Sequence, residues 1–344
     1  MKISRDTNPS NEEWRKLFAV AAEFKKTACW DWMYEDDIFA VEDPETGGFA
    51  YCCIMGNAGE HYAIAGYLGS EGLEGISSML YDEDEESSSD LMFVQKCLMC
   101  SFVDRDELAK EDYQLIKDLK LRFRGRNAWP QFRDFYPGLF PWFLTGQQCR
   151  FLTHIITQAL YVANQCREDK SLIKPNDLGT YFARICDPTS NEALNWNNAH
   201  IKPEQYDPEY VSFKLSDEVL AKRLYLTKKS RNYIVEADTF YMPTLVEEQP
   251  RPFYPKICLL ADQSSGLIIS YTVISDIETD GFQCIEALTT MISEGNRKPT
   301  KILVSREETY FLFKDICTQI GIVLEFVDYL YAIEEARTGM FMDD

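Results

Sequence analysis

The most regular pattern of apolar and polar positions lies between Tyr233 and Val327. Alternating or continuous apolar runs there predict strands, and two stretches with apolar residues at helical spacing predict helices. The expected strands are 232–242, 256–262, 267–274, 301–305 and 322–327, and the expected helices are 282–294 and 310–320. Gly295 and Gly321 stand where the helices should end. We expect one mixed sheet with the first three strands antiparallel. The last two should run parallel to the first, and the preference for right-handed crossovers favours helix 282–294 as the link to the strand at 301–305.

The N-terminal half combines amphipathic helices with turn-linked strands. Apolar residues share one helical face over 11–32, and further helices are expected at 107–119 and 147–165. The expected strands are 38–41, 48–55 and 61–68, whose glycine-containing connections favour an antiparallel meander, and a further strand at 98–102. Pro130–Trp142, rich in proline and aromatic residues, is predicted to be irregular. The predicted fold class is α+β or α/β, with an N-terminal antiparallel sheet with helices and a C-terminal mixed-sheet domain.

Regular patterning fades between Ser171 and Tyr210, where four prolines interrupt the chain. We therefore predict an N-terminal α+β domain over 1–170, an irregular connecting region over 171–229 and a C-terminal domain over 230–344. A chain of 344 residues is long enough for two separate cores.

Composition narrows the classes of partner. A formal net charge of −21 opposes binding to nucleic acid or to an anionic membrane. No apolar run reaches the about 18 residues of a membrane span, and Met1–Pro9 lacks an apolar leader, so we expect a cytoplasmic protein. The 11 cysteines are expected to be reduced thiols. Cys97 and Cys100 have the spacing of a zinc site, but no second pair of ligands follows, so we expect no metal there.

Three stretches, 65–73, 101–108 and 123–132, resemble an uncharacterised family of bacterial two-domain proteins. The second domain of that family is similar to 253–336. Both are known as domains of unknown function, so this resemblance implies no activity.

The C-terminal part is also similar to the ribonuclease H-like core of integrases and transposases. That resemblance implies acidic residues on the first strand, the fourth strand and a later helix, which together hold two magnesium ions. Asp238 matches the first acidic position, and 259–267 and 299–308 resemble the hairpin and the fourth strand with its exit loop. The fourth-strand acidic position holds Ser305. A hydroxyl cannot replace a carboxylate between hard cations, so the core resembles a degenerate one.

Five acidic residues remain candidates for a metal or catalytic site. Glu236 and Asp238 share a strand face and could form a magnesium site with Asp262, while Glu307 or Glu308 from the exit loop could supply a further carboxylate. In the alternative interpretation, Asp262 shapes the turn at 263–266, and Glu236 and Asp238 lie on a solvated strand face.

A run of alternating cations is the candidate binding surface. Lys120, Arg122, Arg124 and Arg126 share one face if the segment is extended, with Trp129 as a neighbouring ring. This cationic ridge could bind phosphate groups. We favour a solvated face or a surface for acidic segments such as Asp82–Glu86.

Two functional hypotheses follow. The first is a protein that binds a partner, which we expect to be a protein, through a non-catalytic ribonuclease H-like domain without a cofactor. The second is a magnesium-dependent nuclease or phosphoryl transferase that uses Asp238, Asp262 and Glu307 or Glu308. Residues 230–344 include 9 basic and 19 acidic residues, which is the wrong sign for a nucleic-acid channel and favours the first hypothesis.

Overall fold

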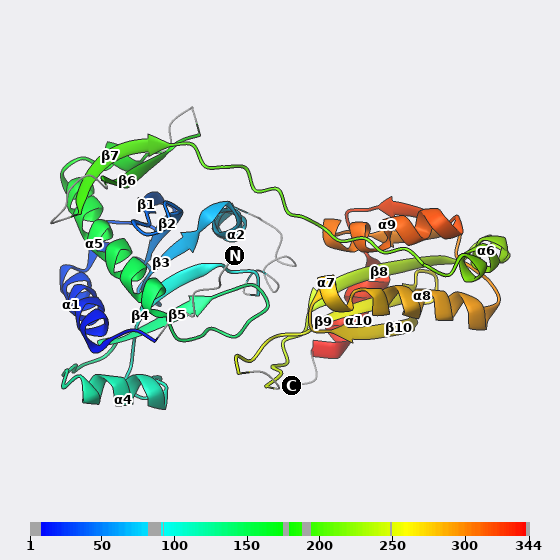
Figure 1. Cartoon of the computed structure of the whole chain (residues 1–344), viewed down its shortest axis with the longest axis horizontal. Coiled ribbons are helices and arrows are strands. Elements are labelled where there is room, and N and C mark those ends of the chain that lie inside the picture. The colour runs from blue at the N-terminus through cyan, green and yellow to red at the C-terminus, as the bar shows by residue number, and fades with distance from the viewer. Residues whose placement is uncertain are drawn as a thin grey trace. The chain divides into compact units, whose positions relative to one another are not determined.

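The computed structural model describes residues 8–81, 91, 93–174, 179–187, 194–247 and 250–341. The chain folds as two compact units, Met1–Tyr206 and Asp207–Asp344 (Figure 1). Their boundary falls within the interval 171–229 that the sequence predicts to connect two domains.

The first unit contains a seven-stranded sheet with the order β5-β4-β3-β2-β1-β6-β7. Its strands are β1 (Phe39–Glu42), β2 (Phe49–Met55), β3 (Tyr62–Leu68), β4 (Cys97–Val103), β5 (Trp129–Phe135), β6 (Tyr181–Asp187) and β7 (Asn195–Ile201). Neighbouring strands from β5 to β1 are antiparallel, and the predicted meander of β1, β2 and β3 is confirmed. The sheet is nevertheless mixed, because β6 joins β1 in parallel.

Helices α1 (Asn11–Thr27) and α5 (Gly146–Glu168) contribute to a large core on one face of this sheet. Both begin at a capping box, with Ser10 and Thr145 as the N-cap residues. Helix α2 (Gly69–Tyr81) contributes Leu73 and Ile76 to the core on the other face. The remaining elements are the short 3₁₀ helices η1 (Cys29–Asp31) and η2 (Lys170–Ile173) and helix α4 (Lys110–Asp118).

The structure corrects two expectations for this part of the chain. The interval 130–142 is not wholly irregular, since its first residues belong to β5. Pro130 is tolerated there because β5 is an edge strand, and its outer side is bridged at Asp134 by Trp142 rather than at Pro130. The region 171–229 is also not irregular throughout, because it contains β6, β7 and a helix of the second unit, α6 (Glu218–Leu226). The polar sequence of β7, another edge strand, lacks the apolar alternation from which a strand is predicted.

The second unit contains a five-stranded sheet with the order β10-β9-β8-β11-β12. Its strands are β8 (Ile234–Tyr241), β9 (Lys256–Asp262), β10 (Ile268–Ile274), β11 (Lys301–Val304) and β12 (Val323–Phe326). The first three are antiparallel, β11 is parallel to β8, and β12 is parallel to β11. The predicted single mixed sheet is confirmed, with its first three strands antiparallel and β11 and β12 running parallel to β8.

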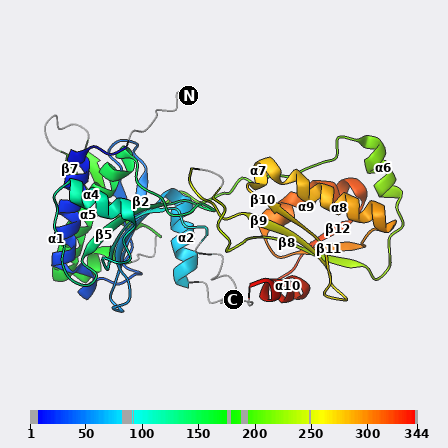
Figure 2. The same cartoon turned by 90° about the horizontal axis from the view of Figure 1, so that it is seen from below.

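Helices cover both faces of this sheet (Figure 2). Helices α6, α8 (Phe282–Gly295) and α9 (Glu307–Ile320) form the larger core on one face, and the one-turn α7 (Ile277–Asp280) precedes α8. Helix α10 (Tyr331–Phe341) packs on β8 and β9 from the opposite face, where Ala332 and Ile333 are buried. The apolar pattern up to Val327 does not predict α10, and this helix determines part of the environment of Glu236 and Asp238.

Candidate functional site

Glu236 and Asp238 lie on the same face of β8, because side chains two residues apart in a strand point the same way. Both residues are only 1% exposed. The expectation that they lie on a solvated strand face is therefore wrong. Helix α10 packs over this face of β8. The helix lies beyond the interval 233–327, so the apolar pattern of that interval gives no sign that the face is covered.

The Asp238 carboxylate is enclosed by hydrogen-bond donors. Arg306 Nε donates to its Oδ2 at 3.0 Å, and Thr309 Oγ1 donates to its Oδ1 at 3.2 Å. The single hydroxyl proton of Thr309 is used in that bond, so the Thr239 hydroxyl is the donor in the 2.7 Å contact between the two threonines. Both carboxylate oxygens of Asp238 are thus engaged by residues at the start of α9.

The charge of Asp238 is balanced by arginine. Burial raises the pKa of Asp238 above its usual value, while the positive charge of Arg306 opposes that rise, as does Arg337 of α10 to a smaller extent. Arg337 is 8% exposed, and its guanidinium lies 4.6 Å from the centre of the Phe240 ring. A buried carboxylate needs such a partner, since an unpaired one in the protein interior is costly.

Glu236 acts at a different place, the N-terminus of α10. Its Oε2 accepts hydrogen bonds from the backbone N–H groups of Ala332 at 2.8 Å and Ile333 at 3.2 Å. Burial raises the pKa of Glu236, and these two hydrogen bonds oppose the rise. The carboxylate thus supplies two of the N–H groups at the helix start with an acceptor and places negative charge at the positive end of the helix dipole.

The other three acidic candidates each have a separate partner. The hydrogen bond from the Ser264 hydroxyl at 2.6 Å lowers the pKa of Asp262 most, and the N–H groups of Ser264 and Ser265 also donate to it, at 2.9 and 3.0 Å, in the turn into β10. Glu307 accepts from the Tyr210 hydroxyl at 3.2 Å. Glu308 is paired with Lys256 at 2.5 Å.

These carboxylates do not converge on a common point. In the β8–β9 register Asp262 lies opposite Val235, whereas Asp238 lies opposite Leu259, three residues along the strand. In the described part of the chain, no group of three or more His, Cys, Asp or Glu residues is placed to hold a metal ion.

Sequence reasoning missed Arg306, Thr309 and Arg337 as the partners of Asp238. The available signal was the position of Arg306, which directly follows Ser305 in the exit loop of the fourth strand. The position at which the resemblance implies a carboxylate is therefore followed by a cation.

The cationic ridge lies in the first unit, between α4 and β5. Lys120, Arg122, Arg124 and Arg126 are exposed, while Leu121 and Phe123 between them pack against the core. Trp129 is half-buried, with its ring 6.0 Å from that of Phe123, so it belongs to the core boundary. Arg126 lies 3.8 Å from Asp104. The acidic segment Asp82–Glu86, suggested as a partner for the ridge, lies outside the described residues.

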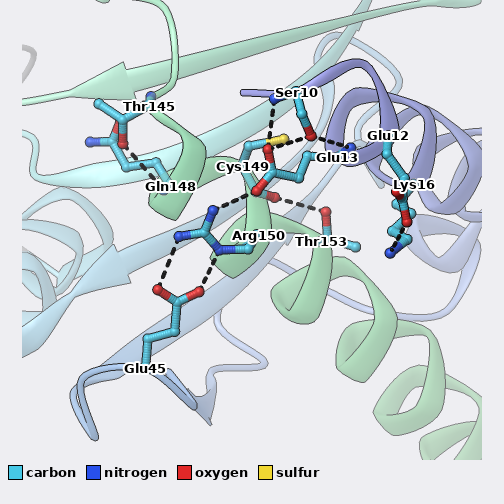
Figure 3. Close-up of polar contacts among 10 residues, drawn as sticks. All are labelled: Ser10, Glu12, Glu13, Lys16, Glu45, Thr145, Gln148, Cys149, Arg150 and Thr153. Atoms are coloured by element: carbon cyan, nitrogen blue, oxygen red, sulfur yellow. Dashed lines mark hydrogen bonds and ion pairs between the residues drawn. The ribbon is translucent and has the colours of Figure 1, made fainter. Parts of the chain in front are cut away.

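A second charged cluster of the first unit joins three segments (Figure 3). Arg150 of α5 pairs at 2.5 Å with Glu13 of α1 and at 2.5 Å with Glu45 of the β1–β2 connection. Hydrogen bonds from Ser10 and from Arg150 lower the pKa of Glu13 to about 2. Every charge drawn in this cluster has an opposite partner, which is the arrangement of a structural clamp.

Cys97 and Cys100 are buried on opposite sides of the first sheet. Cys97 belongs to the core under α2, and Cys100 to the core under α1 and α5. Burial raises the pKa of both thiols. Two thiols on opposite faces of a sheet cannot ligate the same ion.

Comparisons with known proteins place the chain among domains of unknown function. Residues 14–184 match the family model "Domain of unknown function (DUF7309)", and residues 220–341 match "Domain of unknown function (DUF6930)". The chain therefore joins two uncharacterised domains, as the sequence resemblance predicts. No curated protein matches it.

Solved structures similar to the chain include integrases and a transposase. The HTLV-2 integrase catalytic core domain, solved in complex with magnesium, is 18% identical with a TM-score of 0.24, over 31% of this chain and 65% of that one. The simian T-cell lymphotropic virus intasome, solved with PP2A regulatory subunit B56 gamma, is 14% identical with a TM-score of 0.25, over 32% and 38%. The Mos1 transposase paired-end complex is 12% identical with a TM-score of 0.21, over 67% and 57%.

The chain spans less than two thirds of the length of each of these three proteins, and similarity at this level says nothing about chemistry. Among the described residues, no helix combines the length and apolar composition that crossing a membrane requires.

Proposed function

We propose that this chain is a non-catalytic protein-interaction protein whose C-terminal unit is a degenerate ribonuclease H-like domain. The observation that carries the proposal is the buried pairing of Asp238 with Arg306 and Thr309. Two-metal phosphoryl transfer requires carboxylate oxygens directed at cations. At Asp238, a guanidinium and a hydroxyl occupy the oxygens that would bind those cations.

Charge supports the same proposal. The net charge of −10 over 230–344 lowers the local concentration of a polyanionic substrate. Ser305 also removes a carboxylate where the fourth strand ends. A magnesium ion would have to displace Arg306 from a buried site while gaining few new ligands.

The cationic ridge is the surface that we propose for an acidic segment of a protein partner. Lys120, Arg122 and Arg124 have no ion pair with any described residue, although the chain as a whole is strongly acidic. An acidic peptide labelled with a fluorophore should bind the protein in a salt-dependent way. The double change Arg122→Ala and Arg124→Ala should abolish that binding, whereas Lys222→Ala with Arg223→Ala on α6 should not.

The non-catalytic core is tested by metal binding and by cleavage. If the protein had a metal site, a metal concentration about one hundred times Kd would stabilise it by about 2.7 kcal/mol. Because we propose that no such site forms, we expect magnesium and manganese to leave the melting temperature unchanged. Labelled single- and double-stranded DNA and RNA should remain intact with the wild type, the Asp238→Asn variant and the Arg306→Ala variant.

Metal-dependent cutting by the wild type that is lost in Asp238→Asn would overturn the proposal. It would establish the alternative, a metal-dependent nuclease or phosphoryl transferase using Asp238, Asp262 and Glu307 or Glu308. Cutting that appears only in Arg306→Ala would show that the arginine itself silences the core.

A further inference from the structure

In the described part of the chain, the two open sheets end in four edge strands, β5, β7, β10 and β12, of which β5 is bridged on its outer side by Trp142. Exposed edges pair with other chains unless charges, proline or short length prevent it. β5 carries Pro130, Arg133 and Asp134, and β7 is rich in asparagine. β12 has four residues and includes Glu325.

The β10 edge has none of these three features, and its one irregularity, a register shift between Ile268 and Ser270, leaves the pairing of 270–274 regular. Residues 267–274 read Leu-Ile-Ile-Ser-Tyr-Thr-Val-Ile, without a charge, a proline or a glycine. Four of these side chains are largely exposed: Leu267 at 68%, Ile268 at 43%, Tyr271 at 65% and Val273 at 47%. β-branched and aromatic residues of this kind favour pairing with a further strand.

The exposed side chains of β10 continue a buried core. Tyr271 lies opposite Leu259 and Val273 opposite Ile257, and both partners are buried beneath α10. Helix α10 packs on β8 and β9, while Tyr271 and Val273 remain open beside it. Among the described residues, β9 is the only strand that pairs with β10. A strand added at this edge would therefore gain backbone hydrogen bonds and bury the exposed side chains of Tyr271 and Val273.

Acidic residues stand at both ends of this neutral strand. Asp262 precedes it, and Asp276, Glu278 and Asp280 follow it within a few residues. Lys256, which lies opposite Ile274, is already paired with a glutamate at 2.5 Å and does not offset these charges. The occupant that fits is apolar along its middle and basic at its ends.

We propose that the β10 edge binds an extended segment of a partner protein as an added strand. The segment has apolar side chains at alternate positions and lysine or arginine at both ends. This inference rests on the proposed function of protein interaction and identifies a surface for it.

Charge argues against a second copy of this chain as the occupant. Antiparallel pairing of two β10 strands about Tyr271 would place the end of the strand in one copy beside its start in the other. The acidic residues that follow β10, Asp276, Glu278 and Asp280, would then lie near the end at which Asp262 of the other copy stands, and like charges brought together are destabilising.

The test uses the full-length protein and the fluorescein-labelled peptide Lys-Lys-Val-Thr-Val-Tyr-Val-Lys-Lys, followed by fluorescence anisotropy. We expect saturable binding that is lost when the central valine of the peptide is proline or when its lysines are glutamates. Bound peptide should also slow hydrogen exchange in residues 268–274 and leave 323–326 unchanged.

Two valines provide matched variants. Val273 on β10 and Val323 on β12 are 47% and 49% exposed at opposite edges of the same sheet. Val273→Lys should weaken peptide binding at least about tenfold, because an edge lysine blocks strand addition and repels the basic ends. Val323→Lys should leave binding unchanged.

Absence of saturable binding up to about 1 mM peptide would overturn the inference. Equal weakening by both variants would do the same, as would self-association in sedimentation that Val273→Lys abolishes, since that result would identify a second copy as the occupant. Neither variant changes the Asp238 cluster. Metal-dependent cleavage with intact peptide binding would therefore overturn only the non-catalytic core, and a failed peptide assay without cleavage would overturn only the β10 site.

Discussion

Arg306 Nε lies 3.0 Å from Oδ2 of Asp238, and this pair joins the exit of β11 to the middle of β8. Asp238 is 1% exposed and the Arg306 side chain 33%, so the carboxylate is buried and its partner reaches in from the surface. A guanidinium in this position neutralises the carboxylate that a metal would otherwise need. We therefore expect the pair to stabilise the second unit. The pair also favours the non-catalytic interpretation, because it occupies the carboxylate that a catalytic metal would need.

Replacing Arg306 with alanine should destabilise the second unit by about 3 kcal/mol, because it leaves a buried carboxylate without its charged partner. Asp238→Asn should cost less, and the double variant should be more stable than Arg306→Ala alone. Urea unfolding of the full chain measures all three variants. Lys222→Ala, at an exposed position of α6, is the control and should change stability by no more than about 0.5 kcal/mol. Equal losses in Arg306→Ala and the control would contradict the pairing.

The loss of unfolding free energy in the Arg306→Ala variant should depend on pH. Burial already raises the pKa of Asp238, and removing Arg306 raises it further. A raised pKa in the folded state means that the ionised carboxylate opposes folding. Its cost is absent below the unfolded pKa of about 4 and appears as the pH rises through the folded pKa. The difference in unfolding free energy between wild type and Arg306→Ala should thus shrink from pH 7 toward pH 4. The double variant with Asp238→Asn should show no such change.

Glu236→Ala should loosen α10. The change removes the acceptor of two N–H groups at the helix start, which should cost about 2 kcal/mol. Hydrogen exchange of residues 332–340 should accelerate more than that of β8. Glu335→Ala, an exposed change on the same helix, should leave the exchange as it is. Unaltered protection of α10 in Glu236→Ala would show that packing alone holds the helix.

Lys298→Met should destabilise the second unit by about 2–3 kcal/mol, because it leaves buried carbonyl groups without a donor. Lys298 is 2% exposed, and its Nζ donates to the carbonyls of Leu224 at 3.2 Å, Tyr225 at 2.6 Å and Ile320 at 2.6 Å, at the ends of α6 and α9. Lys301→Met, which removes an exposed ion pair, should cost no more than about 1 kcal/mol. Thermal unfolding of the two variants compares them directly.

Local pattern was sufficient for most of the second sheet. β9 begins and ends where the apolar run 256–262 does, and Gly321 ends α9 in a left-handed conformation. Such features depend on alternation, turn residues and helix stops within a few positions. The same reasoning failed at β5, because Pro130 is acceptable only on an edge strand and a local pattern does not reveal which strand is at an edge.

Local alternation along the chain predicts the five strands of the second sheet and places Glu236 and Asp238 on one face of β8. What that face packs against depends on the tertiary fold. Alternation fixes the side of a strand on which a residue lies, but burial depends on a helix about ninety residues further along the chain. The partner of Asp238 depends in turn on where β11 ends beside β8. Local propensity is set by neighbours in the chain, whereas charge pairing and burial are set by neighbours in space.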